Sequence, residues 1–182
     1  VQIVEPDSGQ LVWIPASTVI PGVFAYNDTV SEPWFAPAGI NRGGLNLVVK
    51  AETKLTQTQR DNLYIGAVNP IATFPANGVV VYGQKTLQKK ASALDRVNVR
   101  RLLIALKNFI SEVAQNLVFE QNTIATRNSF LASVNPYLET VQQKQGLYAF
   151  KVIMDDSNNP ADVIDRNQMV GQIYIQPTKT AE

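Results

Sequence analysis

The sequence predicts an α/β (α+β) fold, with a single mixed β-sheet flanked by two long helices and by shorter ones. Hydrophobic residues make up 45% of the 182-residue chain, which suits a globular core. Short apolar runs with an alternating pattern are interspersed with longer segments of helical periodicity. Since strands and helices interleave without a repeat or a convincing linker, residues 1–182 are expected to form one domain.

The first elements predicted are a β-hairpin and a short helix. Two apolar runs, residues 1–4 and 11–14, flank the turn sequence Pro-Asp-Ser-Gly at residues 6–9, which is typical of a hairpin. A helix is expected near residues 19–27. Pro21 falls in its first turn, where proline is tolerated because the missing N–H has no helical partner there.

A strand, a capped helix and a loop are predicted next. The run Leu-Asn-Leu-Val-Val-Lys-Ala at residues 45–51 alternates weakly and is expected to form a strand. Thr56 and Gln59 have the spacing of a capping box, which predicts a helix to about Ile65. Residues 69–78 contain Asn-Pro, Phe-Pro and Asn-Gly dipeptides, so a loop ending in a turn is expected.

The following segment resembles a phosphate-binding loop but is better explained as a strand. Residues 78–86 read Gly-Val-Val-Val-Tyr-Gly-Gln-Lys-Thr, so Gln84 separates the glycine and the lysine that the phosphate motif requires together. The run of three valines and a tyrosine at residues 79–82 favours a strand that ends at Gly83.

Two long helices are expected in the second half of the chain. The first covers residues 96–119, with Asp95 as a good N-cap and apolar residues at helical spacing. The second covers residues 124–144. Pro136 lies inside it and either kinks the helix or begins a new one, and Gly146 is a suitable stop signal.

The chain ends in two strand candidates, residues 147–154 and 169–176, with a polar turn at residues 155–160 between them. Acids and amides like those of this turn bind calcium in EF-hands, but the glycine and glutamate of that motif are absent. A solvated turn with Asn159 as a helix cap is favoured instead, and no metal site is expected.

The composition excludes most catalytic chemistry. The chain has no cysteine and no histidine, so thiolate nucleophiles, imidazole bases and Cys/His metal sites are impossible within it. Nothing in the sequence brings two carboxylates together in an apolar pocket. We therefore expect no catalytic residue and no cofactor. No apolar run has the length of a membrane span, and the net charge of +1 creates no field that attracts nucleic acid.

Positive charge is concentrated between Lys85 and Lys107, here called the basic segment, where seven bases and one acid give a net charge of +6. Arg96, Arg100 and Lys107 fall on one stripe of the expected helix. Binding of single-stranded nucleic acid would require aromatic side chains among these basic residues, and the basic segment contains none. The basic segment is either a solvated helix face or a surface that docks on an acidic protein.

Residues 33–44, Pro-Trp-Phe-Ala-Pro-Ala-Gly-Ile-Asn-Arg-Gly-Gly, are irregular and aromatic at once. The two prolines and three glycines exclude a helix or a central strand. Trp34 and Phe35 are costly to leave in water. We expect them to pin this segment between the helix near residues 19–27 and the strand near residues 45–51.

Five motifs spread over nearly the whole chain share the pattern of one family. They are Pro33-Trp34-Phe35-Ala36-Pro37-Ala38-Gly39, Asn98-Val99-Arg100-Arg101-Leu102, Val118-Phe119-Glu120-Gln121-Asn122, Gly146-Leu147-Tyr148-Ala149-Phe150-Lys151-Val152 and Gly171-Gln172-Ile173-Tyr174-Ile175-Gln176-Pro177. Together they resemble the contractile tail sheath proteins of phages, R-type pyocins and related injection systems, and within these the sheaths of T4-type bacteriophages. The signature positions are Pro33, Trp34, Phe35, Pro37 and Gly39.

The resemblance implies that residues 1–182 are the C-terminal part of a sheath core domain, without its N- and C-terminal arms. It implies a structural, non-enzymatic protein that polymerises as a helical sheath around an inner tail tube. Rigid-body contraction would drive the tube through the host envelope. The implied partners are other sheath copies, the inner tube, the baseplate and the tail terminator, with no direct nucleic acid contact and no membrane insertion. The implied location is the virion, after synthesis in the host cytoplasm.

In this family a helix of the domain faces the inner tube, which suggests a role for the basic segment. We expect the tube contact to comprise Arg96, Arg100 and Lys107, with Lys89, Lys90 and Arg101. Two alternatives stay open. One is a sheath subunit of an R-type pyocin or type VI secretion system, and the less favoured one is an enzyme that works through carboxylates.

Overall fold

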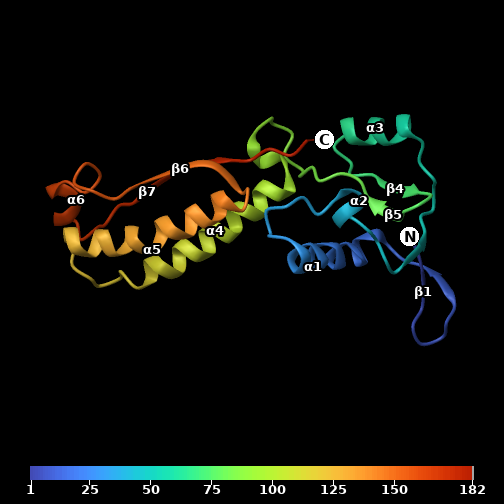
Figure 1. Ribbon diagram of the computed structural model, residues 1–182, viewed down its shortest axis with the longest axis horizontal. Coiled ribbons are helices and arrows are strands. Elements are labelled where there is room, and N and C mark those ends of the chain that lie inside the picture. Colours follow the sequence, from blue (N-terminus) through green and yellow to red (C-terminus); the bar gives the residue numbers. More distant parts are fainter. Residues whose placement is uncertain (182) are drawn as a thin grey trace. The chain divides into compact units, whose positions relative to one another are not determined.

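Figure 1 shows the computed structural model of the protein, which describes residues 1–181. The chain divides into two compact units, Val1–Arg101 and Leu102–Glu182. The boundary falls inside helix α4, Val97–Gln115, so no linker composition marks it in the sequence. The mixed α/β class is confirmed. The single mixed sheet is wrong, because the strands form three separate antiparallel sheets.

The predicted hairpin is part of a three-stranded sheet with the order β2-β1-β3. Its strands are β1, Gln2–Val4; β2, Leu11–Trp13; and β3, Val48–Lys50. Ile3 lies opposite Val12, and both side chains are half-buried. Val4 lies opposite Leu11, and both are exposed. Because successive side chains of a strand point to opposite faces, this sheet has a covered face and an open face.

A second sheet pairs β4, Ile71–Phe74, with β5, Gly78–Val81. The strand β4 lies where a loop was expected, since turn dipeptides at both of its ends concealed four residues of strand. Gly44 forms a further antiparallel bridge with Val80. The buried core of this unit contains Val23, Leu45, Val79 and Val81.

Besides the start of α4, the first unit contains five helical segments. They are η1, Ala16–Thr18; α1, Ile20–Val30; α2, Gly39–Arg42; α3, Gln57–Ile65; and η2, Ala93–Asp95. Pro21 lies in the first turn of α1, as expected. The capping box of α3 is confirmed. The Thr56 hydroxyl accepts from the N–H of Gln59, and the Gln59 side chain accepts from the N–H of Thr56.

The two long helices of the prediction are present. Asp95 belongs to η2 and does not cap α4, because α4 begins only at Val97. The second long helix, α5, extends over Ile124–Gln143 and continues through Pro136. Since α5 is one helix, the alternative in which Pro136 begins a new one is wrong. Among residues 1–181, no helix combines the length and hydropathy needed to cross a bilayer.

In the second unit a helix pair packs with a hairpin (Figure 1). Phe109 of α4 stacks on Tyr137 of α5, with ring centroids 3.8 Å apart. The third sheet pairs β6, Leu147–Ile153, with β7, Gln172–Pro177, and β6 packs on α5. The short helix α6, Ala161–Asp165, lies between these strands in the sequence.

The C-terminal end of α5 uses an unusual residue in a common motif. The N–H of Gly146 bonds to the carbonyl of Val141 (2.8 Å), and the N–H of Gln145 bonds to that of Gln142 (3.0 Å). These bonds define a Schellman motif, whose left-handed position usually holds glycine. Here Gln145 has the positive φ (+62°), and Gly146 follows one residue later.

Candidate interaction surfaces

The Pro/Gly-rich segment of residues 33–44 is fixed by packing within the first unit. Trp34 is only 8% exposed. Phe35 is half-buried, and the guanidinium of Arg42 lies 5.2 Å from its ring centroid. Arg42 also donates from Nε to the carbonyl of Ala36 (3.0 Å). The two aromatic side chains therefore serve the fold of this unit.

Glycines determine the path of the same segment. Gly39 has a φ of +82° and begins the single helical turn α2, so the expectation of a wholly irregular segment is wrong here. A Cβ at Gly43 would lie 2.5 Å from the carbonyl oxygen of Val81, whose N–H bonds to the carbonyl of Gly43 (2.8 Å). Two backbones approach so closely only where the side chain is absent. Of the other signature positions, Pro37 is buried and Pro33 is half-buried.

Three of the seven bases of the basic segment are held inside the first unit: Lys85, Arg96 and Arg101. Lys85 donates from Nζ to the carbonyl of Tyr64 (2.7 Å) and lies 3.7 Å from the centroid of that ring. Arg96 forms an ion pair with Asp95 (3.0 Å) and precedes α4. The expected stripe of three bases on one helix therefore has only two members on the helix.

Arg101 joins the start of α4 to α1. Its Nη2 atom lies 2.7 Å and 2.6 Å from the two carboxylate oxygens of Asp28. Its guanidinium also lies 5.1 Å from the ring centroid of Phe24. Arg101 is therefore engaged within the subunit through Nη2 and the face of its guanidinium, while its buried Nη1 has no hydrogen-bond partner among residues 1–181.

The other four bases, Lys89, Lys90, Arg100 and Lys107, are exposed, and their side chains form no ion pair or hydrogen bond with residues 1–181. Arg100 and Lys107 are seven residues apart on α4, so they share a face at about 100° per residue. Ile104 lies between them on that face and is 57% exposed. We call Arg100, Ile104 and Lys107 the α4 face. An apolar side chain between two unpaired cations suits a protein partner with acidic groups.

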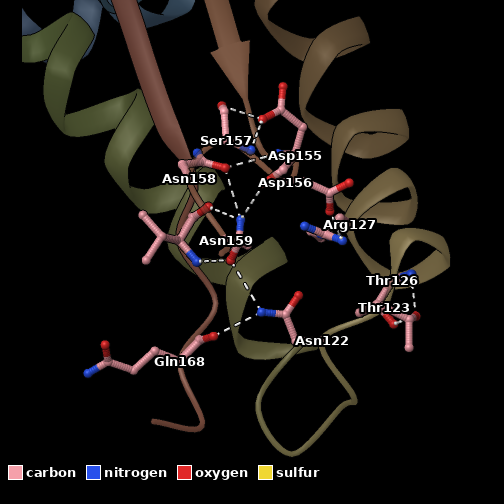
Figure 2. Close-up of polar contacts among 11 residues, drawn as sticks. Asn122, Thr123, Thr126, Arg127, Asp155, Asp156, Ser157, Asn158, Asn159 and Gln168 are labelled. Carbon is pink, nitrogen blue, oxygen red and sulfur yellow. Dashed lines mark hydrogen bonds and ion pairs between the residues drawn. The ribbon is translucent and has the colours of Figure 1, made fainter. Parts of the chain in front are cut away.

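A polar network fixes three loops of the second unit (Figure 2). Its centre is the buried Asn159, which donates from Nδ2 to the carbonyls of Val170 (2.8 Å) and Asp155 (3.1 Å). The Oδ1 atom of Asn159 accepts from the N–H of Val170 (2.8 Å). Asn122, in the α4–α5 connection, donates to Asn159 Oδ1 (3.2 Å) and to the carbonyl of Gln168 (2.9 Å). The buried Asn159 and the half-buried Asn122 thus replace backbone partners that irregular loops lack.

The carboxylates beside this network are engaged within the same region. Asp156 accepts from Nη2 of the buried Arg127 on α5 (2.8 Å). Asp155 accepts from the hydroxyl of Ser157 and from its N–H (2.8 Å), and these bonds lower the pKa of Asp155. Among residues 1–181, no group of three or more acidic side chains could hold a metal ion.

Sequence reasoning missed both the Asn159 network and the Arg101 pair. Asn159 was expected to cap a helix, which is wrong, since the N-cap of α6 is Pro160 and no side chain caps it. The contacts of Asn159 with Asn122 and Val170 depend on how distant loops meet. A run of polar residues in the sequence indicates solvent exposure. The sequence alone does not show that one amide of the run, that of Asn159, is buried.

Two family models match the chain and together cover nearly all of it. The model described as the phage tail sheath protein central domain matches residues 3–87. The model described as the phage tail sheath C-terminal domain matches residues 89–182.

Two curated relatives are tail sheath proteins of phages. That of Vibrio phage KVP40 is 45% identical over 168 residues, which are 92% of this chain and 25% of the relative. That of Enterobacteria phage T4 is 40% identical over 92% of this chain and 26% of the relative. The chain thus spans about a quarter of the length of the curated relatives it matches.

Solved structures of contractile injection systems contain similar chains. The sheath complex of the extracellular contractile injection system PVC, in its contracted state, matches with a TM-score of 0.86 and 26% identity, over 98% of this chain and 51% of that chain. The baseplate structure of the anti-feeding prophage matches with a TM-score of 0.84 and 28% identity, over 100% of this chain and 51% of that chain. The predicted family is confirmed, and so is the prediction of a structural protein in place of an enzyme. The chain belongs to the phage tail sheath protein family, whose central and C-terminal domains it matches in sequence.

Proposed function

We propose that this chain assembles with other copies into a helical sheath around an inner tail tube. Contraction of the sheath, with each subunit moving as a rigid body, drives the tube through the host envelope. The observation that carries the proposal is the match of 98% of the chain to a chain of an injection-system sheath solved in its contracted state. Identical subunits that meet through two different surfaces form an open helical array when the rotation between them does not close into a ring, and a sheath requires such an array.

The α4 face is the surface proposed to contact the inner tube. Its two cations are unpaired, its isoleucine is exposed, and the exposed Lys89 and Lys90 add positive charge nearby in the sequence. An acidic tube surface would complement it. Exposed ion pairs contribute roughly 0–1 kcal/mol each. Many such weak contacts hold a sheath together, and each one breaks easily on contraction.

Two bases that the sequence suggested for the tube contact are left out of this proposal, because they form ion pairs within the subunit. Arg96 pairs with Asp95, and Arg101 pairs with Asp28. A partner that used either cation would first have to break an existing ion pair. We therefore restrict the proposed tube contact to the exposed bases.

Charge reversal on the α4 face tests the tube contact. We expect the double variant Arg100→Glu, Lys107→Glu to fold normally by circular dichroism but to coat purified inner tubes poorly in electron micrographs. The matched control is Lys54→Glu, Lys179→Glu, which reverses two exposed lysines elsewhere and is expected to coat tubes like the unmodified protein. Normal coating by the α4 variant would contradict the tube contact. Failure of the unmodified protein to form tubular assemblies with or without inner tubes would contradict the sheath itself.

A phage tail is favoured over a bacterial injection system as the setting of this sheath. The 45% and 40% identities are to phage sheaths, whereas the injection-system chains are 26% and 28% identical. The proposed location is the virion tail after synthesis in the host cytoplasm, and the proposed further partners are the baseplate and the tail terminator. Labelling of phage particles with an antibody to this chain tests the location. Label along the tail supports it, and unlabelled particles contradict it.

A further inference from the structure

The connection between α4 and α5 holds an aromatic side chain in water. Phe119 is 100% exposed, and Val118 and Ile124 beside it are each more than half exposed. Phe119 also has a φ of +72°, in the left-handed region that disfavours residues with a Cβ. An exposed aromatic ring and a strained backbone both raise the free energy of an isolated subunit. Backbone strain clusters at functional sites but also occurs at helix ends such as Gln145, so it is the full exposure of the ring that sets Phe119 apart.

The connection is braced, so the position of Phe119 is set in advance. The N–H of Glu120 bonds to the carbonyl of Leu117 (3.1 Å), and Asn122 is anchored to the network of Figure 2 by two hydrogen bonds. Thr123 then caps α5 by accepting from the N–H of Thr126 (3.3 Å). A side chain held outward by a fixed loop loses little conformational freedom when it binds.

The open face of the β2-β1-β3 sheet is a second apolar surface, in the other unit of the chain. Val4, Leu11 and Trp13 project from it and are 50%, 55% and 50% exposed. The register places Gln2 between Trp13 and Lys50, and Lys50 Nζ lies 5.6 Å from the centroid of the Trp13 ring. This face therefore combines a contiguous apolar patch, which calls for a partner, with a cation at its edge.

We propose that the 118–120 tip, formed by Val118, Phe119 and Glu120, docks on the open β2-β1-β3 face of a second copy of this chain. The proposal rests on the self-assembly described under the proposed function. Phe119 meets an apolar patch that contains an aromatic ring, and Glu120 approaches Lys50, so the two surfaces are complementary in polarity and charge. Since the tip and the sheet face are different surfaces, the contact is head-to-tail, so it can continue from copy to copy around a ring or along a helix.

Crosslinking between two populations tests this contact directly. The chain has no cysteine, so each introduced thiol is unique. Protein with Val118→Cys is mixed with protein with Leu11→Cys and treated with a short bifunctional maleimide. We expect a crosslinked dimer in this mixture. The control mixture pairs Val118→Cys with Leu87→Cys, which is 95% exposed and lies outside both surfaces, and no dimer is expected there. Equal crosslinking in both mixtures, or in neither, overturns the proposal.

The variant Phe119→Gly separates loss of the contact from loss of folding. Glycine relieves the positive φ, so we expect the thermal midpoint of the single subunit to be unchanged or higher. We expect the association constant from sedimentation to fall about tenfold or more, as for truncation of an aromatic hot spot. Reversal of Glu120 or Lys50 alone should weaken association, and Glu120→Lys combined with Lys50→Glu should restore it. If the unmodified protein assembles and these variants assemble equally well, only this contact fails. If the unmodified protein never assembles, the sheath proposal fails with it.

Discussion

Residues 33–44 and residues 116–123 are both connecting segments with aromatic side chains, and they use those side chains in opposite ways. In the first, Trp34 is buried and the positive φ falls on Gly39, a residue that tolerates it. In the second, the fully exposed Phe119 itself has the positive φ. The first segment stabilises the subunit that contains it. The second has two energetic costs in that subunit, which the proposed contact with a second copy would offset.

Loss of the buried indole is the largest effect expected from this comparison. The change Trp34→Ala should lower the free energy of unfolding by about 3–5 kcal/mol, because it removes a large buried side chain and leaves a cavity. Urea denaturation followed by circular dichroism measures it. Trp13→Ala provides the control within the same chain, since Trp13 is half-exposed and its loss should cost clearly less. Equal losses would remove the distinction between buried and exposed aromatic residues.

A methyl group at Gly43 tests whether the first segment is packed backbone against backbone. Gly43→Ala places a Cβ 2.5 Å from the carbonyl of Val81, and we expect it to destabilise the protein by about 1–3 kcal/mol. Gly22 lies inside α1, and apart from its chain neighbours and the backbone of its own helix nothing lies within 4 Å of the position that a methyl group would take there, so Gly22→Ala should stabilise by roughly 0.5–1 kcal/mol. Opposite signs for the two alanines support close packing at Gly43. The same sign for both contradicts it.

The smallest effect is expected where a residue other than glycine has a positive φ. Gln145→Gly should raise the free energy of unfolding by about 0.5–1 kcal/mol, because glycine accepts the left-handed conformation at the end of α5 without steric cost. Differential scanning calorimetry measures the shift in Tm. Phe119→Gly should shift Tm in the same direction. A lower Tm for Gln145→Gly would show that its side chain contributes more than its backbone costs.

Local features of the fold were predictable from the sequence, and non-local pairing was not. The capping box at Thr56 and the helix over residues 124–143 depend on neighbours three or four residues away, so the sequence alone indicates them. The prediction of a single sheet was wrong because strands can pair with partners that are distant in the sequence. β1 pairs both with β2, close in sequence, and with β3, which follows after more than forty residues.

The proposed tube contact likewise has a local part that the sequence indicates and a non-local part that it does not. The sequence shows that positive charge is concentrated between Lys85 and Lys107. It does not show which of these bases form ion pairs within the subunit and which stay exposed. Asp28, which pairs with Arg101, lies 73 residues away. Only the folded chain shows that Arg101 is occupied and that Arg100, its neighbour, is exposed. Helical periodicity places Arg100 on a face, whereas tertiary contacts decide which bases remain available.

The network around Asn159 also affects how the protein ages. Asparagine deamidates when the backbone nitrogen of the next residue attacks the side-chain amide and closes a succinimide ring. The next residue here is Pro160, whose nitrogen carries no hydrogen. The amide that holds three loops together is therefore protected from this reaction by its sequence neighbour, and by burial as well. In a long-lived assembly such as the proposed sheath, this protection would help to preserve the arrangement of the three loops.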